Sequence, residues 1–527
     1  MPHQPLTGSV RVHLTASEAY PALETMFLNA TSEVWASFLV FDLDTALRSD
    51  AGRAVGRTWF DLLVHVLRRG VKLHFVLADV DPVVRADMHR AATRSLRRFV
   101  AAREVAGPAA ELNVVAARHP AQSGAVLRLA IWPYIQMKLK GTARRLNHLA
   151  LPQRVAALRD MPGMTPYLRT HADGRVAVRR FCLPRLYPAL HHQKLAVFDR
   201  SLLYIGGLDL DERRYDTPKH NQPAAQTWHD LQLIVDGPVV TEAQAHLETF
   251  RAVANGDAPV ATHRRLLTTL SQKRPFNLFR FGPATCAAQI STGHSVLVNR
   301  STRLIYLETQ YFRNRALALD LARRAQKEPG LTMILVLPAA PDDVAFEGNR
   351  GPDARFGAFQ QARALRIIRR AFGPRLFIAS PAQQRRAGPA QGAPKEGGDV
   401  AANSDRLNGA PMVYVHAKVS VFDDNAAIVS SANLNGRSLF WDTEAGVYLY
   451  RHVQVEDLRR RVMAHWLPEN ANAAAFALDT AAATWARISR DNARTAPEQR
   501  KGFLLPHDFA AAELFGRPLP MVPDELV

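Results

Sequence analysis

Apolar and polar positions near the start of the chain predict a strand, a helix and a strand. Residues Val10 to Leu14 alternate between apolar and polar side chains, as a half-buried strand does, and residues 34–41 form a short apolar run typical of a buried strand. An amphipathic helix is predicted over residues 57–69, where Gly70 ends it, and residues 71–77 follow as another strand. This order of elements is typical of an α/β domain.

The second half of the chain repeats the order. Strands are predicted over residues 287–291 and 304–307, a helix over about 315–326, and a strand over 331–337 after Gly330. Such a repeat indicates an internal duplication. We therefore predict an α/β fold of two similar α/β/α sandwich domains, packed face to face with the active site at their interface.

Changes in composition suggest where these domains begin and end. The first is predicted to span residues 1–255, the linker 256–282 and the second domain 283–527. Residues 383–408 are rich in Gly, Pro, Ala, Gln and Asn, lack apolar periodicity, and are predicted to form a mobile loop that borders the site. Further helices are predicted over residues 356–372, 455–467 and 473–490.

A basic insertion, residues 126–180, interrupts the first domain. It mixes Trp132 and Tyr134 with Lys138 and Lys140, as segments that lie at a membrane interface do. A helical hairpin that packs on its own domain explains the same pattern equally well. Both interpretations stay open at this stage.

One short motif occurs twice with the same spacing. Each copy has a histidine, a lysine two residues later and an aspartate five residues beyond the lysine, followed by a turn of two small residues, a variable residue and a polar one. The copies are His192-Gln193-Lys194 with Asp199 and Gly206-Gly207-Leu208-Asp209, then His416-Ala417-Lys418 with Asp423 and Ser430-Ser431-Ala432-Asn433. A single His-x-Lys would more often be a solvated strand face, but two copies in one register predict two half-sites.

The residue types indicate phosphodiester chemistry. Histidine and lysine at positions i and i+2 of a strand point to the same face, so each copy presents an imidazole beside an ammonium group. Two histidines supply a nucleophile and a proton donor, whereas two lysines neutralise the oxygens of an anion. These groups already provide positive charge, and the Cys, His, Asp and Glu residues have no metal-ligand spacing, so we predict no metal and no cofactor. Turnover is accordingly expected to survive EDTA.

The paired motifs resemble the HKD motifs of the phospholipase D superfamily, and further stretches are most similar to eukaryotic-type phospholipases D. The similarity covers most of the core from about residue 180 to 450. Ser430 and Thr309 depart from the family pattern, which usually has glycine and asparagine there. The similar stretches are Gly206 to Leu210 with Arg214 to Pro218, Thr227 to Asp230 with Val235 to Pro238, Leu307 to Phe312, and Ser431 to Ser438 with Asp442 to Glu444.

The resemblance implies a role for each histidine. His192 is expected to attack phosphorus and form a phosphohistidine, and His416 to protonate the leaving group and then activate water. Asp230 and Glu444, which lie downstream of the respective motifs, are expected to orient the imidazoles. The remaining candidates are Asp199 and Asp423, placed with the catalytic set but more plausible as strand braces, and the substrate-binding residues Ser431, Asn433, Gly207 and Asp209.

Composition narrows the choice of partner and compartment. The formal net charge is +19 over 527 residues, which favours an anionic partner, either acidic lipid or nucleic acid. Only Cys182 and Cys286 are present, so no disulfide framework is expected. No classical secretion signal and no apolar run long enough to span a bilayer is visible. We expect a monomer that is cytoplasmic or peripheral on a membrane, or exported by a specialised route.

Four functions are compatible with the motifs. The leading hypothesis is a phospholipase D that releases phosphatidate and a free head group from phosphatidylcholine-like lipids, with no obligate nucleic acid. A phosphatidyl transferase of the cardiolipin synthase kind, which uses a lipid alcohol in place of water, is the first alternative. A nuclease is the second, encouraged by the net charge of +19. A lipid-binding protein without catalytic activity is the third, and the two intact His/Lys pairs argue against it.

Overall fold

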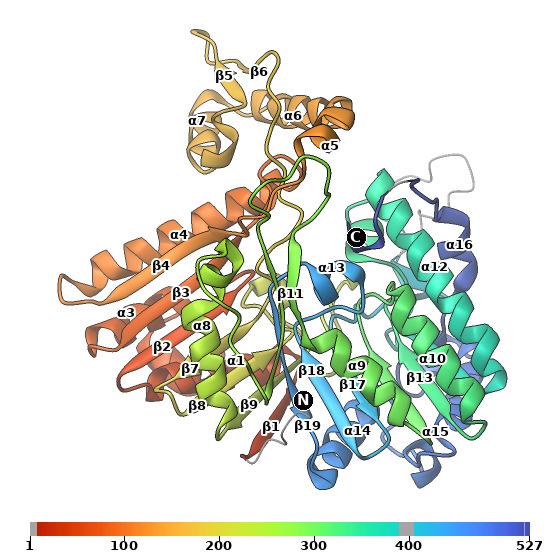
Figure 1. The fold of residues 1–527 in the computed structure, drawn as a ribbon. Helices are drawn as coiled ribbons and strands as arrows, with labels where there is room; N and C mark the ends of the chain where they lie inside the picture. Colours follow the sequence, from red (N-terminus) through yellow and green to blue (C-terminus); the bar gives the residue numbers. More distant parts are fainter. Residues whose placement is uncertain (1–7, 389–404, 521, 527) are drawn as a thin grey trace.

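The computed structural model describes residues 8–388, 405–520 and 522–526. Two large sheets form the body of the molecule, with helices packed against them (Figure 1). The first sheet has the strand order β1-β9-β8-β7-β2-β3-β4. Its strands are β1 (Val10–Leu14), β2 (Glu33–Phe38), β3 (Lys72–Asp79), β4 (Leu112–Arg118), β7 (Leu195–Phe198), β8 (Leu202–Gly206) and β9 (Leu231–Asp236).

The second sheet repeats this order with one additional strand at each edge. Its order is β11-β10-β19-β18-β17-β12-β13-β14-β20. Without the edge strands β11 and β20, this order matches that of the first sheet position by position, with β10 in the place of β1 and β14 in the place of β4. The predicted duplication is therefore confirmed. The strands are β10 (Leu266–Gln272), β11 (Ala284–Ala288), β12 (Leu304–Glu308), β13 (Thr332–Val336), β14 (Leu376–Pro381), β17 (Val419–Phe422), β18 (Ala426–Ser430), β19 (Glu444–Leu449) and β20 (Leu504–Pro506).

Helices cover each sheet in the same way. One apolar cluster, which includes Phe27, Trp59 and Phe75, packs three helices on the first sheet, and an equivalent cluster with Leu321 and Ile368 packs three on the second. The first three are α1 (Thr15–Asn29), α3 (Trp59–Arg68) and α4 (Ala86–Ala106), and the second three are α9 (Gln289–Arg300), α10 (Arg315–Lys327) and α12 (Pro352–Phe372). Shorter helices are α2 (Asp50–Val55), α11 (Asp342–Ala345), α13 (Gly436–Phe440) and α16 (Phe509–Phe515).

A third apolar cluster joins the two units. It combines residues of both sheets with residues of α8 (Val239–Asn255), α14 (His452–Trp466) and α15 (Ala481–Ala493). Leu203 and Leu233 of the first sheet belong to the same cluster as Val429 and Val447 of the second. Removal of this shared apolar surface from water is what holds the units together.

Several sequence predictions are confirmed and three are wrong in detail. The helices predicted over 57–69, 315–326, 356–372 and 455–467 correspond to α3, α10, α12 and α14. The strand predicted over 287–291 ends at Ala288, because Ile290, Leu297 and Val298 are buried at helical spacing in α9. The helix predicted from 473 begins only at Ala481, after a short turn.

The predicted linker, residues 256–282, is also wrong in its central part. Residues 266–272 form β10, which pairs with β19 on one side and β11 on the other. Leu266, Leu267 and Leu270 are buried there, so the segment belongs to the core of the second unit. Polar residues on both sides of this short apolar run concealed the strand.

The basic insertion forms a lobe that projects from the body (top of Figure 1). Ile135, Leu139, Leu146 and Met164 are buried in a small core of the lobe, which also includes Val83 and Ala86 of the first unit. The lobe consists of α5 (Ala125–Ala130), α6 (Trp132–Asn147), α7 (Leu151–Arg159), β5 (Leu168–Thr170) and β6 (Val176–Val178). No helix in the described part of the chain combines the length and the apolar character that a membrane crossing needs.

The predicted mobile loop, residues 383–408, lies mostly outside the described residues. Its described end contains β15 (Arg406–Leu407), which pairs with β16 (Ala410–Pro411). On the other end, the side-chain amide of Gln383 donates to the carbonyl of Gln222 at 2.8 Å. Both cysteines are described and both are free, as predicted.

Candidate active site

Both His-x-Lys segments lie just before a central strand, one in each sheet. His192 and Lys194 precede β7, and His416 and Lys418 precede β17. All four residues are buried, with Lys194 fully inaccessible to solvent. In the first sheet β7 begins beside the end of β2, and in the second sheet β17 begins beside the end of β12. The two segments therefore occupy equivalent positions in their sheets.

Backbone hydrogen bonds connect each segment to the other unit. The amide of His192 donates to the carbonyl of Thr443 at 2.9 Å, just before β19 of the second sheet. In the same way, the amide of His416 donates to the carbonyl of His229 at 2.7 Å, just before β9 of the first sheet. The two half-sites are thus joined across the interface by matching contacts.

The imidazole–carboxylate pairs are crossed between the units. His192 Nδ1 lies 2.9 Å from Glu444 Oε1, and His416 Nδ1 lies 2.6 Å from Asp230 Oδ2. Sequence analysis placed one acidic residue downstream of each motif, but each carboxylate contacts the histidine of the other half. With Nδ1 engaged by a carboxylate, Nε2 of each imidazole is left to face a substrate.

The two lysines have different surroundings. Lys194 Nζ lies 3.5 Å from Asp209 Oδ2, and Arg214 forms an ion pair with the same carboxylate. The position that matches Asp209 in the second unit holds Asn433, a neutral amide. Lys418 Nζ lies 2.9 Å from His416 Nδ1 and also donates to the carbonyl oxygen of His416.

Burial shifts the pKa of every ionisable group at the centre of the site. It lowers the pKa of His192 and of His416 well below the usual value, and nearby lysine charge acts in the same direction. It lowers the pKa of Lys418 to about 7. The pKa values of Asp230 and Glu444 are raised by burial. An anionic phosphodiester bound in the site favours the protonated forms of its bases.

Three of the four predicted substrate-binding residues lie against the carboxylate and ammonium groups of the candidate site. A Cβ atom on Gly207 would lie 2.2 Å from Asp230 Oδ1, so glycine leaves the space which that carboxylate occupies. Ser431 Oγ donates to Glu444 Oε2 at 2.5 Å, and Asp209 holds Lys194. Asn433 differs, because its Oδ1 is buried without a hydrogen-bond partner among the described residues.

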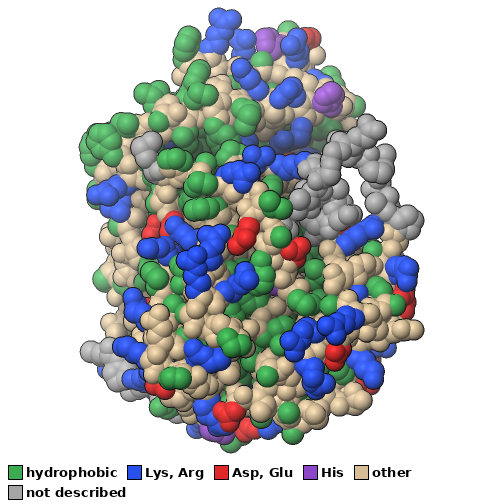
Figure 2. All heavy atoms as spheres, turned by 90° about the vertical axis from the view of Figure 1, so that its right-hand side faces the viewer, with side chains coloured by type: hydrophobic (Ala, Val, Ile, Leu, Met, Phe, Trp, Pro, Cys, Tyr) green, Lys and Arg blue, Asp and Glu red, His purple; other side chains and the backbone are tan. Residues whose placement is uncertain are grey.

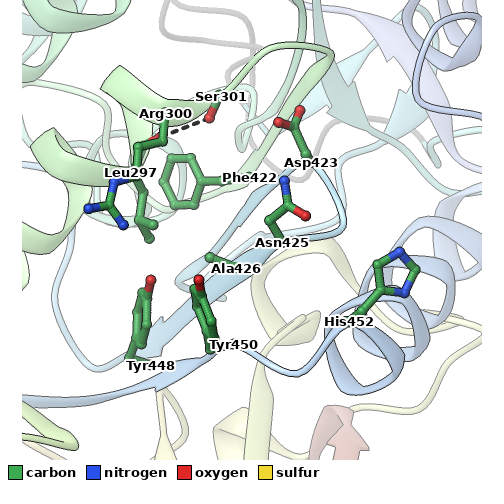
Figure 3. A pocket seen from close by; sticks show the side chains of 10 residues that line it. All are labelled: Leu297, Arg300, Ser301, Phe422, Asp423, Asn425, Ala426, Tyr448, Tyr450 and His452. Carbon is green, nitrogen blue, oxygen red and sulfur yellow. Dashed lines mark hydrogen bonds between the residues drawn. The ribbon is translucent and has the colours of Figure 1, made fainter. Parts of the chain in front are cut away.

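Asp199 and Asp423 lie at the far end of their strands and brace the backbone. Asp199 accepts hydrogen bonds from the amides of residues 31–33, and Asp423 from those of residues 302–304. Both residues have positive φ, 49° and 54°. Figure 3 shows Asp423 beside a separate hollow of about 280 Å³ next to Tyr448 and Tyr450. The alternative placement of these aspartates with the catalytic set is therefore not supported by their contacts.

Sequence reasoning missed several residues of the site. The Trp228 ring lies 4.5 Å from the His416 ring, centroid to centroid, and the Arg214 guanidinium lies 5.1 Å above the Trp228 ring. Asp442 accepts from the amide of Leu190 at 2.9 Å and pairs with Arg437. Trp228, Arg214 and Asp442 all belong to the motifs quoted above, but nothing in their spacing indicates these contacts.

Three histidines form another cluster that the sequence did not reveal. Ring nitrogens of His220, His229 and His465 lie within 4.8 Å of one another. The prediction of no metal-ligand group rested on sequence spacing, which cannot detect ligands from distant segments. His191, in contrast, makes a hydrogen-bond contact outside this cluster, since its Nδ1 lies 2.8 Å from Thr443 Oγ1.

Comparisons with known proteins agree with this geometry. Phospholipase D alpha 1 of Nicotiana tabacum is 23% identical over 47% of the chain, and a cardiolipin synthase of Listeria monocytogenes is 24% identical over 51% of it. Both relatives are members of the phospholipase D superfamily, whose paired motifs those of this chain resemble. The alignments cover 44% and 46% of those proteins, so the chain spans about half the length of the curated relatives it matches.

Two further comparisons concern protein-family models and solved structures. No protein-family model matches the sequence. Among solved structures, a phosphatidylserine synthase of Haemophilus influenzae Rd KW20 aligns with 88% of both chains at 13% identity and a TM-score of 0.47. The superfamily contains enzymes that act on phospholipids, either as phosphodiesterases or as phosphatidyl transferases.

The crossed pairs lead to a testable expectation for their carboxylates. Glu444→Gln and Asp230→Asn keep the shape but lose the negative charge, and each should lower kcat by about 10–100-fold. Glu444→Gln should perturb the NMR signals of the His192 ring more than those of the His416 ring, and Asp230→Asn should do the reverse. Perturbation of the histidine in the same half by each substitution would contradict the crossed arrangement.

Proposed function

We propose that the protein is a phospholipase D that hydrolyses the distal phosphodiester of phosphatidylcholine-like lipids to phosphatidate and a free head group. The observation that carries this proposal is the pair of buried His–Lys units, each with an imidazole held by a carboxylate from the opposite unit. Two imidazoles and two ammonium groups match the needs of an anionic diester, whose oxygens repel a nucleophile unless they are neutralised.

The reaction proceeds in two displacements at phosphorus. His192 Nε2 attacks the phosphorus atom, the bond from phosphorus to the head-group oxygen breaks, and His416 Nε2 gives that oxygen its proton. His416 Nε2 then takes a proton from water, whose oxygen attacks phosphorus and releases His192. Lys194 and Lys418 neutralise the non-bridging oxygens in both steps.

Trapping with alcohol tests the covalent intermediate. If the phosphatidyl group waits on His192, ethanol or butanol should divert product from phosphatidate to phosphatidyl-alcohol, while head-group release changes far less than this partition. The measurement is a product analysis on vesicles of mixed lipids, with phosphorus configuration followed on a chiral substrate. Retention is expected because two inversions cancel. Inversion without an alcohol adduct, even at high alcohol, would mean direct attack by water.

Phosphatidyl transfer to a lipid alcohol is the second candidate, favoured by the similarity to cardiolipin synthase over 51% of the chain. The same product analysis separates the two, because a transferase should form a phosphatidyl-lipid as its main product when a lipid alcohol is present. Single-stranded DNA in a parallel assay tests the nuclease alternative. Cleavage of DNA with no lipid product would replace the lipid proposal.

The projecting lobe supports contact with an anionic membrane. Between residues 125 and 181 it has eleven Lys and Arg residues against two Asp. Exposed apolar side chains accompany this charge, with Phe181 91% exposed and Leu129 65%, and the neighbouring Phe276 80%. Figure 2 shows basic and apolar side chains gathered on the lobe at the top of the molecule. Such a combination is typical of surfaces that bind the lipid interface.

Membrane binding should depend on this surface. Binding to vesicles that contain acidic lipid is expected to exceed binding to neutral vesicles and to fall as salt is raised, because screening weakens the attraction. A Phe181→Ser, Phe276→Ser double variant should bind several-fold more weakly in a sedimentation assay. The control is Val453→Ser, a 78% exposed apolar residue on α14 at the opposite end of the molecule. Equal loss in the control, or binding independent of salt, would contradict the assignment.

A further inference from the structure

The histidine cluster lies at the junction of the two units. His220 and His229 both come from the loop that leads from Asp216 to β9, and His229 lies two residues before that strand. His465 comes from the last turn of α14, which belongs to the second unit. His220 and His229 are fully buried, and His465 is partly buried, so the three imidazoles converge in the interior.

Carboxylates hold two of these imidazoles from behind. His220 Nδ1 lies 2.6 Å from Asp216 Oδ2, which leaves His220 Nε2 pointing towards His465 Nε2 at 2.8 Å. His229 Nε2 lies 3.1 Å from Glu308 Oε2, which leaves His229 Nδ1. A carboxylate on the outer nitrogen is the usual support of a metal-ligating histidine, because it fixes the tautomer and orients the ring.

One nitrogen of the cluster lacks a partner. His229 Nδ1 is buried and has no hydrogen-bond partner among the described residues. His220 Nε2 and His465 Nε2 form one N–H···N hydrogen bond with each other, which a bound cation would replace. A buried polar atom such as His229 Nδ1 is rarely left unpaired, and a cation would accept its lone pair together with those of the other two imidazoles.

We propose that His220, His229 and His465 bind one divalent transition-metal ion, with Zn²⁺ as the best fit. Three imidazole nitrogens are a common ligand set for Zn²⁺, and the carboxylates of Asp216 and Glu308 balance the charge of a buried dication. Zn–N bonds of about 2.0–2.1 Å in a tetrahedral site place the nitrogens roughly 3.4 Å apart. The His465 ring therefore moves back by about half an ångström from its present 2.8 Å contact with His220.

The ion has a structural role, and this inference is independent of the reaction that the protein catalyses. It ties a loop of the first unit to α14 of the second. It also fixes His229, whose carbonyl accepts from the His416 amide and whose neighbour Asp230 holds the His416 ring. The ion touches no reacting atom, so a chelator lowers the thermal stability of the protein, while the chemical step needs no metal as predicted from the motifs.

Metal analysis of the full-length protein tests the proposal. After removal of metal with a chelator, the protein should bind one equivalent of Zn²⁺, and its Tm should rise by at least about 2 °C when free Zn²⁺ exceeds the Kd 100-fold. Mg²⁺ should leave Tm unchanged. Co²⁺ in the same site should give the strong visible absorption of a four-coordinate complex. Failure of the wild-type protein to bind a stoichiometric ion would overturn the proposal.

Variants locate the ion within the protein. His465→Gln should abolish the Tm rise and the Co²⁺ absorption, whereas His452→Gln, an exposed histidine on the first turn of the same helix, should leave both unchanged. His465→Cys should restore binding and add a thiolate–Co²⁺ charge-transfer band. This restoration keeps the test informative if His465→Gln folds poorly. Wild-type binding in His465→Gln would place the ion elsewhere and exclude this site.

Discussion

His192→Ala and His416→Ala should each abolish measurable turnover of phospholipid. Loss of the general acid is expected to lower kcat by about 10²–10⁴-fold. Loss of the nucleophile removes the covalent route altogether, so the effect of His192→Ala should be at least as large. Neither histidine can replace the other, because each is held at Nδ1 by its own carboxylate. Release of the head group from vesicles measures both effects.

A substrate with a good leaving group separates the two roles. A phosphodiester of p-nitrophenol needs little proton donation, so it should restore much of the activity of His416→Ala but none of that of His192→Ala. His452→Ala, remote from the site, serves as the control for substitution of a histidine. Rescue of His192→Ala, with His416→Ala inactive, would exchange the assigned roles. Wild-type turnover by either variant would remove the two-histidine mechanism.

A second large effect is expected at Lys418, both on rate and on pH dependence. Lys418→Met should lower kcat/KM by about 10²–10³-fold, because it removes charge from the developing oxyanion. Burial lowers the pKa of Lys418 to about 7, and only the protonated amine neutralises phosphate. In the wild type, kcat/KM should therefore fall as pH rises through about 7. The bound diester favours the ammonium form, so the corresponding fall in kcat should occur at higher pH.

Two variants test whether Lys418 is the group that titrates. Lys418→Arg keeps a charge at every accessible pH and should remove the alkaline fall, even if its larger side chain lowers the rate. Lys194→Met should lower the rate and move the fall to higher pH, because the nearby charge of Lys194 contributes to lowering the pKa of Lys418. Persistence of the fall in Lys418→Arg would assign it to another group.

Local sequence was sufficient to predict the repeat and the identity of the central residues. Each motif combines a buried strand with side chains at fixed offsets, and such short-range patterns survive in a single sequence. The crossed pairing was not predictable in the same way. Asp230 and Glu444 are downstream of their own motifs at similar offsets, and only the packing of the two units brings each to the opposite histidine.

Other misses have the same physical origin. The sequence of β10 suggested a linker because this strand is buried by its neighbours in the sheet. These neighbours are β11 and β19, and both follow β10 in the chain, β19 by more than 170 residues. His465 belongs to a helix far from His220 and His229 in sequence, so no spacing rule identifies the cluster. The periodicity of apolar residues predicts that a helix or strand is present, but it does not predict which other elements pack against it.

The repeat breaks its own symmetry at the point where chemistry requires it. Gly207 and Ser431 occupy matching positions, yet one leaves room for Asp230 and the other donates to Glu444. Likewise Asp209 forms an ion pair with Lys194, whereas the matching sequence position in the second unit holds the neutral Asn433. In two identical half-sites, either imidazole would be equally able to act as the base or as the acid. Both motifs are intact, but a few residues next to them differ between the two units. These differences make the two half-sites unequal, so that one histidine can attack phosphorus while the other delivers a proton to the leaving group.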